Sequence, residues 1–298
     1  MVEYKDIFTV FIISYNRADR VYTYNTLKRQ GYTGDIYIII DKSDPQKEEY
    51  RKRYEDKVII FDKNDYLWVD LLDNNINDKQ TPVYARNAVY DIAENLGYKY
   101  FLVLDDDYRG FEFPGMRFIK KKRAKDCKID NLDDIFKIVL DFYINTPFKV
   151  IAFAQSGDFI CGKGRYIYVT RENEIKFNRK VMNSHFCSVD RRIEWKGRMN
   201  DDVNTYVYWG NKGYLFLTIY FISLYQQVTQ TNPGGLTETY KRYNTYKKSF
   251  MSLMCCPSSI KISSISQIYI RPHHKIFWEY TVPAIIPEKY KKCQDHQK

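Results

Sequence analysis

This chain of 298 residues lacks several features by which phosphate-binding, membrane and exported proteins are recognised. It contains no GxxxxGK[ST] loop, so it is not a P-loop nucleotide-binding protein. Its start, MVEYKDIF, has no basic segment followed by a long apolar run, which argues against a signal peptide. Its most apolar segment, 214–225, is too short to span a bilayer. These absences predict a cytoplasmic protein without a membrane segment.

Cysteine occurs six times, but no two cysteines have the CxxC spacing of zinc or redox sites. Cys255 and Cys256 are adjacent, and we do not expect a disulfide between them. Reduced thiols in a cytosolic protein are the simplest interpretation.

The positive charge of the chain is unevenly distributed. The net charge is +10, yet residues 1–110 hold 16 Lys/Arg and 20 Asp/Glu, while residues 111–298 hold 31 and 17. The second half therefore carries about +14, which favours a polyanionic partner such as DNA. The alternative is a solvated basic surface without a partner.

The whole chain is 44% hydrophobic, which suits a large core, and apolar runs alternate with helical patterns in its first half. Such alternation with uninterrupted apolar strands predicts an α/β fold: a Rossmann-like, mostly parallel sheet flanked by helices. The expected strands are 8–14, 35–41, 57–62 and 99–105, and the expected helices are 17–31, 45–55 and 82–97.

The second half predicts a mixed arrangement, with short antiparallel strands over 165–190. Asn200 or Asp201 is expected to cap a helix over 199–213. Further elements are expected at 111–123 (strand into a basic loop), 131–145 (helix), 150–157 (strand), 214–225 (core strand) and 234–254 (helix). We expect one compact domain with a functional division near residue 110.

Three polar clusters follow expected strands of the sheet. They are SYNR (14–17), DKSD (41–44) and DDD (105–107). Because ligands bind beyond the carboxyl ends of parallel strands, three clusters at one edge predict a binding site there.

The run DDD places three carboxylates where mutual repulsion favours a cation. Carboxylate oxygens suit Mg²⁺ or Mn²⁺, which in turn bind diphosphates. The alternative is a helix cap or a solvated turn. Haloacid-dehalogenase phosphatases are excluded because their aspartates follow the first strand, and nucleotidyltransferases because no glycine-rich loop follows it.

Five motifs together resemble the GT-A glycosyltransferases, whose sheet binds a nucleotide-sugar and whose DxD motif holds a divalent metal. The motifs are SYNRADR (14–20), ARN (85–87), DDD (105–107), NDD (200–202) and HH (273–274).

The finer pattern is similar to one group, the TET/J-binding-protein-associated glycosyltransferases, which include the base J glucosyltransferase and many phage enzymes. The segments that carry this likeness are GGLTETYKRYNTYKKSFMSLMCCPSSIKI and RPHHKIFWEYTVPAIIPEKY. The resemblance implies transfer of a sugar from a UDP-sugar to the hydroxymethyl group of a 5-hydroxymethylpyrimidine in DNA, and we expect an inverting reaction with an aspartate base. Which sugar is moved, whether the base is cytosine or uracil, and the anomeric outcome stay open.

The resemblance also implies roles for individual residues. Asp202 is expected to be the general base, ahead of Asp201, although NDD in place of the usual ED leaves open which of the two it is. Asp106 is expected to point into solvent. The donor-binding residues are Ser14, Arg17, Asp41, Arg86 and Asp105, and the metal ligands are Asp105, Asp107 and His274.

Each of these roles has a simpler alternative. Asp41 suits a cap for the following helix equally well. Arg17 and Arg86 suit a diphosphate, but equally neutralisation of the aspartates or a surface ion pair. His274 is alternatively an ordinary, partly buried histidine.

Two basic segments are expected to contact the DNA backbone, since lysine and arginine bind phosphate. They contribute Lys120, Lys121, Lys122 and Arg123 from a loop, and Lys241, Arg242, Lys247 and Lys248 from a helix. Their alternatives are a solvated loop and an amphipathic helix. We expect double-stranded DNA, since the pyrimidine 5-position faces the major groove, and base flipping stays open.

Two rival functions remain from the sequence alone. One keeps the enzyme and replaces DNA by a polysaccharide, lipid or protein acceptor. The other is a non-catalytic DNA-binding protein on a glycosyltransferase scaffold.

Overall fold

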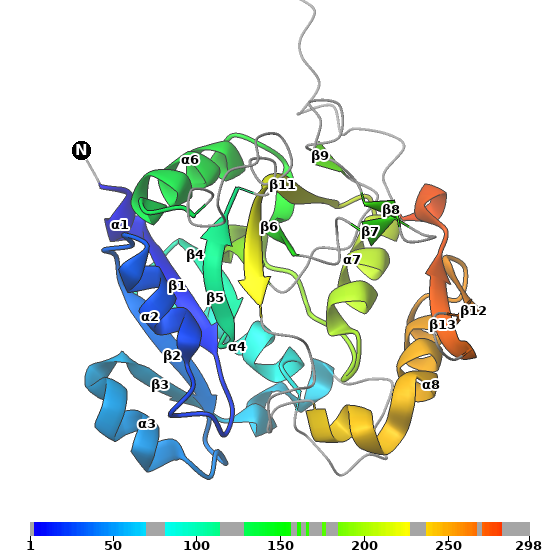
Figure 1. Ribbon diagram of the computed structural model, residues 1–298, viewed down its shortest axis with the longest axis horizontal. Coiled ribbons are helices and arrows are strands. Elements are labelled where there is room, and N and C mark those ends of the chain that lie inside the picture. The colour runs from blue at the N-terminus through cyan, green and yellow to red at the C-terminus, as the bar shows by residue number, and fades with distance from the viewer. Residues whose placement is uncertain are drawn as a thin grey trace, which may run out of the picture.

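The computed structural model describes residues 3–69, 81–113, 128–155, 160–161, 165–166, 175–176, 184–226, 237–266 and 270–281 (Figure 1). Within these residues, a nine-stranded sheet has the strand order β3-β2-β1-β4-β10-β6-β11-β5, with β9 paired to β11. Its strands are β1 (Phe8–Ile13), β2 (Ile36–Asp41), β3 (Val58–Phe61), β4 (Tyr100–Asp105), β5 (Tyr108–Glu112), β6 (Phe148–Gln155), β9 (Ile175–Lys176), β10 (Ser184–Ser188) and β11 (Leu215–Gln226).

The helices flank this sheet, and two small hairpins lie apart from it (Figure 1). The helices are α1 (Tyr4–Ile7), α2 (Tyr22–Arg29), α3 (Lys47–Tyr54), α4 (Val83–Asn95), α6 (Leu132–Ile144), α7 (Asp201–Asn211) and α8 (Thr237–Cys255). The hairpins are β7 (Ile160–Cys161) with β8 (Arg165–Tyr166), and β12 (Ile260–Ser266) with β13 (Ile270–Ile276). Short 3-10 segments are η1 (Glu55–Lys57), η2 (Lys63–Val69), η6 (Val189–Arg191) and η7 (Trp278–Tyr280).

The first half of the sheet is parallel throughout, since β1 pairs in parallel with both β2 and β4, and β2 with β3. The second half is mixed. Strand β10 is antiparallel to both β4 and β6, and β11 runs parallel to β6. Because β10 is antiparallel to both of its neighbours, β6 and β11 run in the same direction as β4. The predicted α/β class, with a parallel first half and a mixed second half, is confirmed.

This topology brings the ends of six strands to one edge of the sheet. They end there because β1, β2, β3, β4, β6 and β11 all point the same way. The edge therefore gathers polar groups from the whole width of the sheet, the place where open α/β sheets bind ligands.

Both faces of the sheet are buried, as the uninterrupted apolar strands require. Helices α2, α3 and α6 contribute to the core on one face, and α4 and α7 to the core on the other. On the first face, the ring of Phe136 from α6 packs against the rings of Phe8, Phe111, Phe153 and Phe186. Truncating a fully buried phenylalanine like this one costs about 3–5 kcal/mol, so the edge rests on a rigid base.

The predicted helix over 17–31 begins later, at Tyr22. Asn16 has a left-handed backbone, with φ of 55°, and the amides that follow it are bonded outside any helix. The Asn16 amide donates to Asp44 Oδ2 at 2.8 Å, and the Ala18 amide to the side-chain oxygen of Gln46 at 2.8 Å. These side chains hold the segment after β1 as a loop against the start of α3.

No helix in the described ranges combines the length and apolar character needed to cross a bilayer.

Candidate active site

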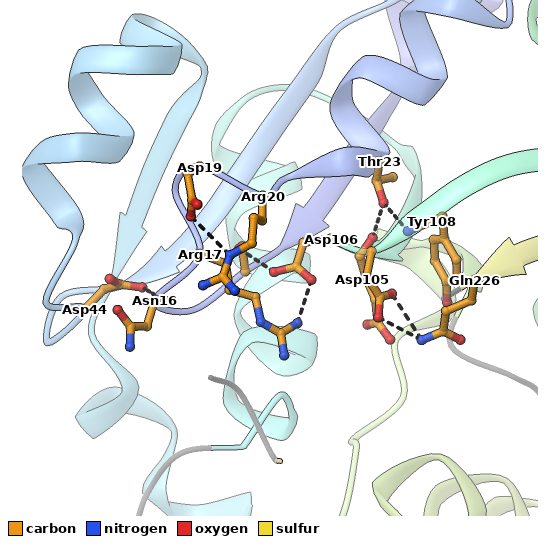
Figure 2. A network of polar contacts seen from close by, with 12 residues as sticks. Asn16, Arg17, Asp19, Arg20, Thr23, Asp44, Asp105, Asp106, Tyr108 and Gln226 are labelled. Atoms are coloured by element: carbon orange, nitrogen blue, oxygen red, sulfur yellow. Dashed lines mark hydrogen bonds and ion pairs between the residues drawn. The ribbon is translucent and has the colours of Figure 1, made fainter. Parts of the chain in front are cut away.

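The loop after β1 is tied to the second aspartate of the DDD run. Ser14 Oγ donates to Asp106 Oδ2 at 2.6 Å and lies 2.7 Å from the hydroxyl of Tyr50. Arg17 Nη1 donates to Asp106 Oδ1 at 2.9 Å (Figure 2). Asp106 is only 3% exposed, so the expectation that it points into solvent is wrong. Because β1 and β4 are neighbours, the donors after β1 reach this buried carboxylate and satisfy both its oxygens.

Asp41, at the end of β2, is held inside its own loop. It accepts hydrogen bonds from the amide and hydroxyl of Ser43 and from the amide of Lys63 at 3.1 Å, and Lys63 Nζ lies 3.1 Å away. Burial tends to raise the pKa of Asp41, but these donors together lower it below its usual value. Asp41 does not cap α3, because the residue preceding that helix is Gln46 and Asp44 receives its amide.

Arg86 of α4 joins the two acidic motifs. One guanidinium nitrogen, Nη1, donates to Asp201 Oδ2 at the start of α7, and the other, Nη2, lies 3.7 Å from Asp105 Oδ1. The guanidinium also stands 5.3 Å from the ring centre of Trp195, a cation–π distance. Arg86 is 3% exposed. Of its predicted alternatives, the structure therefore shows neutralisation of aspartates and excludes a surface ion pair.

Asp107 is held by a residue that sequence reasoning missed. Gln226 Nε2 donates to both carboxylate oxygens of Asp107, at 3.1 and 3.0 Å. Gln226 ends β11, and Gln155 ends the neighbouring β6, where its amide donates to the Tyr108 hydroxyl at 2.8 Å. The sequence did offer a signal for both glutamines, because each stands at the end of an apolar strand, much as Ser14 directly follows β1. Figure 2 shows Gln226 on the same side of the edge as Asp105 and Tyr108.

Burial and mutual repulsion shift the acidic groups toward their neutral forms. Burial, opposed by Arg86 and reinforced by Asp107 and Asp106, raises the pKa of Asp105 to about 7. Burial raises the pKa of Asp106 to about 6 despite Arg17 and Ser14, and that of Asp201 to about 6 despite Arg86. The positive charges of Arg17 and Arg86 are thus too few to balance the carboxylates of this cluster.

A divalent cation is therefore a chemical fit for the cluster. Asp105 and Asp107 supply hard carboxylate oxygens, which Mg²⁺ and Mn²⁺ prefer, and a cation would relieve their repulsion. Among the described residues, however, no three His, Cys, Asp or Glu side chains are gathered as a metal-binding group. The assignment of Asp105, Asp107 and His274 as joint ligands therefore stays a prediction.

His274 lies on β13, beside the start of α7. Its Nδ1 is 3.3 Å from Asn200 Nδ2, and its ring lies 4.3 Å from that of His273. The direction of this contact depends on the tautomer of the His274 ring.

The start of α7 differs from the expected cap. Asn200 occupies the cap position, but its backbone is left-handed, with φ of 56°, and its side chain makes no cap hydrogen bond. Asp201 is 4% exposed and bonded to Arg86, whereas Asp202 is half-buried. The two acidic side chains therefore have different surroundings, as separate roles require.

The structure brings most of the expected donor and catalytic residues to one edge of the sheet. Of the residues expected to contact DNA, it describes only a few side chains. Lys120, Lys121, Lys122 and Arg123 lie outside the described residues. Lys241 and Arg242 lie on α8, but their side chains are outside the description. Lys247 and Lys248 are half-buried on the same helix.

Comparison with known families gives one extensive match. Residues 8–235 match the family model described as TET-Associated Glycosyltransferase. This span covers four of the five motifs, SYNRADR, ARN, DDD and NDD, and it confirms the family. It leaves out HH and nearly all of the two segments, 234–262 and 271–290, on which the finer likeness was based. No curated protein matches the chain.

Several solved structures are distantly similar. S. aureus TarS 1–349 shares 13% identity over 72% of this chain and 59% of its own, with a TM-score of 0.37. The complex of S. aureus TarS 1–349 with UDP-GlcNAc shares 12% over 78% and 63%, with a TM-score of 0.39. A mycobacterial protein shares 8% over 93% and 83%, with a TM-score of 0.45. The chain thus spans less than two thirds of either TarS structure.

Proposed function

Because the chain belongs to the TET-associated glycosyltransferase family, we propose that it moves a sugar from a UDP-sugar to the hydroxymethyl group of a 5-hydroxymethylpyrimidine in DNA. The observation that carries the proposal is the buried link from Asp105 through Arg86 to Asp201. It joins the acidic run, which we propose binds a cation, to a second acidic motif, and this pairing supports a metal-dependent sugar transfer.

The first half, residues 1–110, is proposed to bind the donor. Ser14 and Arg17 fix the loop after β1, and Asp41 ends β2 at the same edge, where the nucleotide would lie. Asp105 and Asp107 would hold Mn²⁺ or Mg²⁺, which stabilises the negative charge that grows on the leaving diphosphate. Gln226 keeps the Asp107 carboxylate in one orientation for that task.

The second half, residues 111–298, is proposed to bind the acceptor and supply the base. Asp201 is buried and bonded to Arg86, whereas Asp202 is only half-buried, so we assign Asp202 as the carboxylate that takes the proton of the acceptor hydroxyl. The hydroxyl oxygen then bonds to the anomeric carbon of the sugar as the bond from that carbon to the diphosphate oxygen breaks. Attack from the face opposite the leaving UDP inverts the anomeric centre.

The DNA acceptor rests on the family and on charge. Residues 111–298 hold 31 Lys/Arg against 17 Asp/Glu, and α8, with Lys247 and Lys248, borders the start of α7. Lysine contacts with phosphate would make binding weaken as salt rises. A polysaccharide, lipid or protein acceptor is the rival class, and activity insensitive to salt and to added DNA would favour it.

The decisive test is a mass-spectrometric nucleoside assay. The protein is incubated with Mn²⁺, a mixture of UDP-sugars, and duplex DNA carrying hydroxymethylcytosine or hydroxymethyluracil. The reaction should add a hexose or pentose mass to one nucleoside. Asp107→Ala should abolish the gain. Asp19→Ala is the matched control, since Asp19 is 55% exposed in the nearby loop and its loss should leave the gain intact.

Either negative result is informative. UDP release without a nucleoside mass gain would retain the donor site and reject the DNA acceptor. Tight DNA binding with neither UDP-sugar binding nor UDP release would favour a non-catalytic DNA-binding protein.

A further inference from the structure

The C-terminal unit, defined here as residues 237–281, lies outside the family match, which ends at residue 235. It consists of α8, the hairpin β12–β13 and η7, and it stands on the outer side of α7 (Figure 1). The hairpin makes no strand pairing with the central sheet in the described residues. The unit is therefore joined to the rest of the protein mainly through side-chain contacts, and many of these contacts are with α7.

The middle and the end of α7 are packed closely against this unit. The rings of Tyr206 and Trp278 stack at 5.6 Å with an interplanar angle of 7°. Ser259 Oγ donates to Asn211 Oδ1 at 3.1 Å. A Cβ added at Gly210 would lie 1.9 Å from the Thr281 carbonyl oxygen, so only glycine fits there.

The beginning of α7 is held by polar contacts instead. The Met199 amide donates to the sulfur of Met251 at 3.3 Å. The side-chain amide of Asn200 lies 3.0 Å from Ser252 Oγ, 3.4 Å from the Lys248 carbonyl oxygen and 3.3 Å from His274 Nδ1. Asn200 is 4% exposed, so these contacts are shielded from water.

The backbone of Asn200 turns sharply at the point where these contacts are made. Its φ of 56° and ψ of 34° are left-handed, a conformation that asparagine and glycine adopt most readily. The chain therefore turns sharply into α7 at the residue whose side chain is bonded to α8 and β13. The next residue, Asp201, is bonded to Arg86 from the opposite side.

We propose that Asn200 is a positioning residue: it ties the first turn of α7 to the C-terminal unit and so fixes Asp202 relative to Asp105 and Asp107. The inference rests on the proposed function only for the role of Asp202. Its physical content is that a side chain bonded to the C-terminal unit sets the geometry of the acceptor step, where small displacements cost much rate.

Asn200→Gly is the primary variant, because glycine keeps the left-handed turn and removes only the amide. Between about 10- and 100-fold should be lost from kcat, while the Kd for UDP-sugar stays within a factor of two. Ser252→Ala removes one of the three contacts and should have a smaller effect. The double variant should be no slower than Asn200→Gly, because the shared contact is already gone.

Ser259→Ala is the matched control. Ser259 is buried and also bonds α7 to the C-terminal unit, but at the far end of the helix. It should leave kcat unchanged. Equal losses of kcat in Asn200→Gly and Ser259→Ala, or a normal kcat in Asn200→Gly, would overturn the positioning role.

Hydrogen–deuterium exchange tests the same idea without catalysis. Asn200→Gly should speed amide exchange in residues 201–205 more than in 208–212, with no change in α2. If the wild-type protein glycosylates no DNA, the proposed function fails, while the exchange result still decides the positioning role. Unchanged exchange in 201–205 would reject it.

Discussion

Arg86 and Asp201 form an ion pair in which the two side chains are only 3% and 6% exposed. The arginine comes from α4, which packs on the parallel half of the sheet, and the aspartate opens α7. This buried ion pair thus connects the proposed donor and acceptor halves. The same guanidinium reaches toward Asp105, so both acidic motifs share one counter-charge.

Loss of this arginine should destabilise the protein strongly. Arg86→Ala leaves Asp201 buried without its partner, and breaking a buried pair costs about 3–5 kcal/mol in free energy of unfolding. Chemical denaturation would measure the loss. Arg192→Ala is the control, because its pair with Asp91 is 37% and 39% exposed, and such pairs contribute at most about 1 kcal/mol. Equal effects of the two substitutions would contradict the importance of burial.

Asp107 should be needed for cation-dependent donor binding but not for folding. Asp107→Asn keeps the shape and an acceptor for Gln226 but removes the charge, so Mn²⁺-dependent UDP binding should weaken about 100-fold, the scale of a lost metal ligand. Titration calorimetry with and without Mn²⁺ measures this directly. An unchanged Mn²⁺ dependence would place the cation elsewhere. Thermal unfolding should be unaffected, since the amide of Gln226 that holds Asp107 can still donate to the side-chain oxygen of asparagine.

A second ionic contact should govern acid stability. Asp133 at the start of α6 accepts from the Tyr4 hydroxyl at 2.7 Å and from the Thr33 amide and hydroxyl at 3.0 and 2.7 Å, with Lys5 Nζ 2.9 Å away. Burial opposes ionisation, but these donors outweigh it and lower the pKa of Asp133 to about 2.

The sign of the pH effect follows from that lowered pKa. The unfolded carboxyl titrates near 3.8 and the folded one near 2, so this contribution is complete above pH 4 and is lost as pH falls toward 2. It amounts to about 1–2 kcal/mol. Asp133→Asn should therefore lower stability at pH 5 and flatten its decline between pH 4 and 2. The measurement is the free energy of unfolding of both proteins at several pH values. A decline between pH 4 and 2 that is equally steep in Asp133→Asn and in the wild type would refute this.

Strand and helix identity in the first half could be predicted because local pattern and burial agree. The run FTVFIIS is apolar throughout, and β1 is indeed covered on both faces. The late start of α2 could not be predicted, because it depends on Asp44 and Gln46 capturing loop amides from another segment. Such bonds join residues 28 positions apart, and no local pattern records them.

The same reason explains the errors in the site. A run of three aspartates indicates a charged edge, but it does not tell which carboxylate is buried. Ser14 and Arg17 make Asp106 the structural member of the run, because β1 and β4 are adjacent in the sheet. Gln226 was missed because it meets Asp107 only when β11 pairs with β5, the strand that begins directly after Asp107.

The two aspartates of NDD should separate in their effects on rate and stability. Asp202→Asn should lower kcat by about 10²–10⁴-fold, the usual contribution of a general base, with unchanged Kd for UDP-sugar and unchanged thermal stability. Asp201→Asn should instead lower stability, since it leaves the buried Arg86 with an uncharged partner, and its kcat should fall less. Both variants are measured for nucleoside glycosylation and for thermal unfolding. If Asp201→Asn removes activity while Asp202→Asn retains it, the base is Asp201, and Arg86 then serves to hold that base rather than to hold the helix.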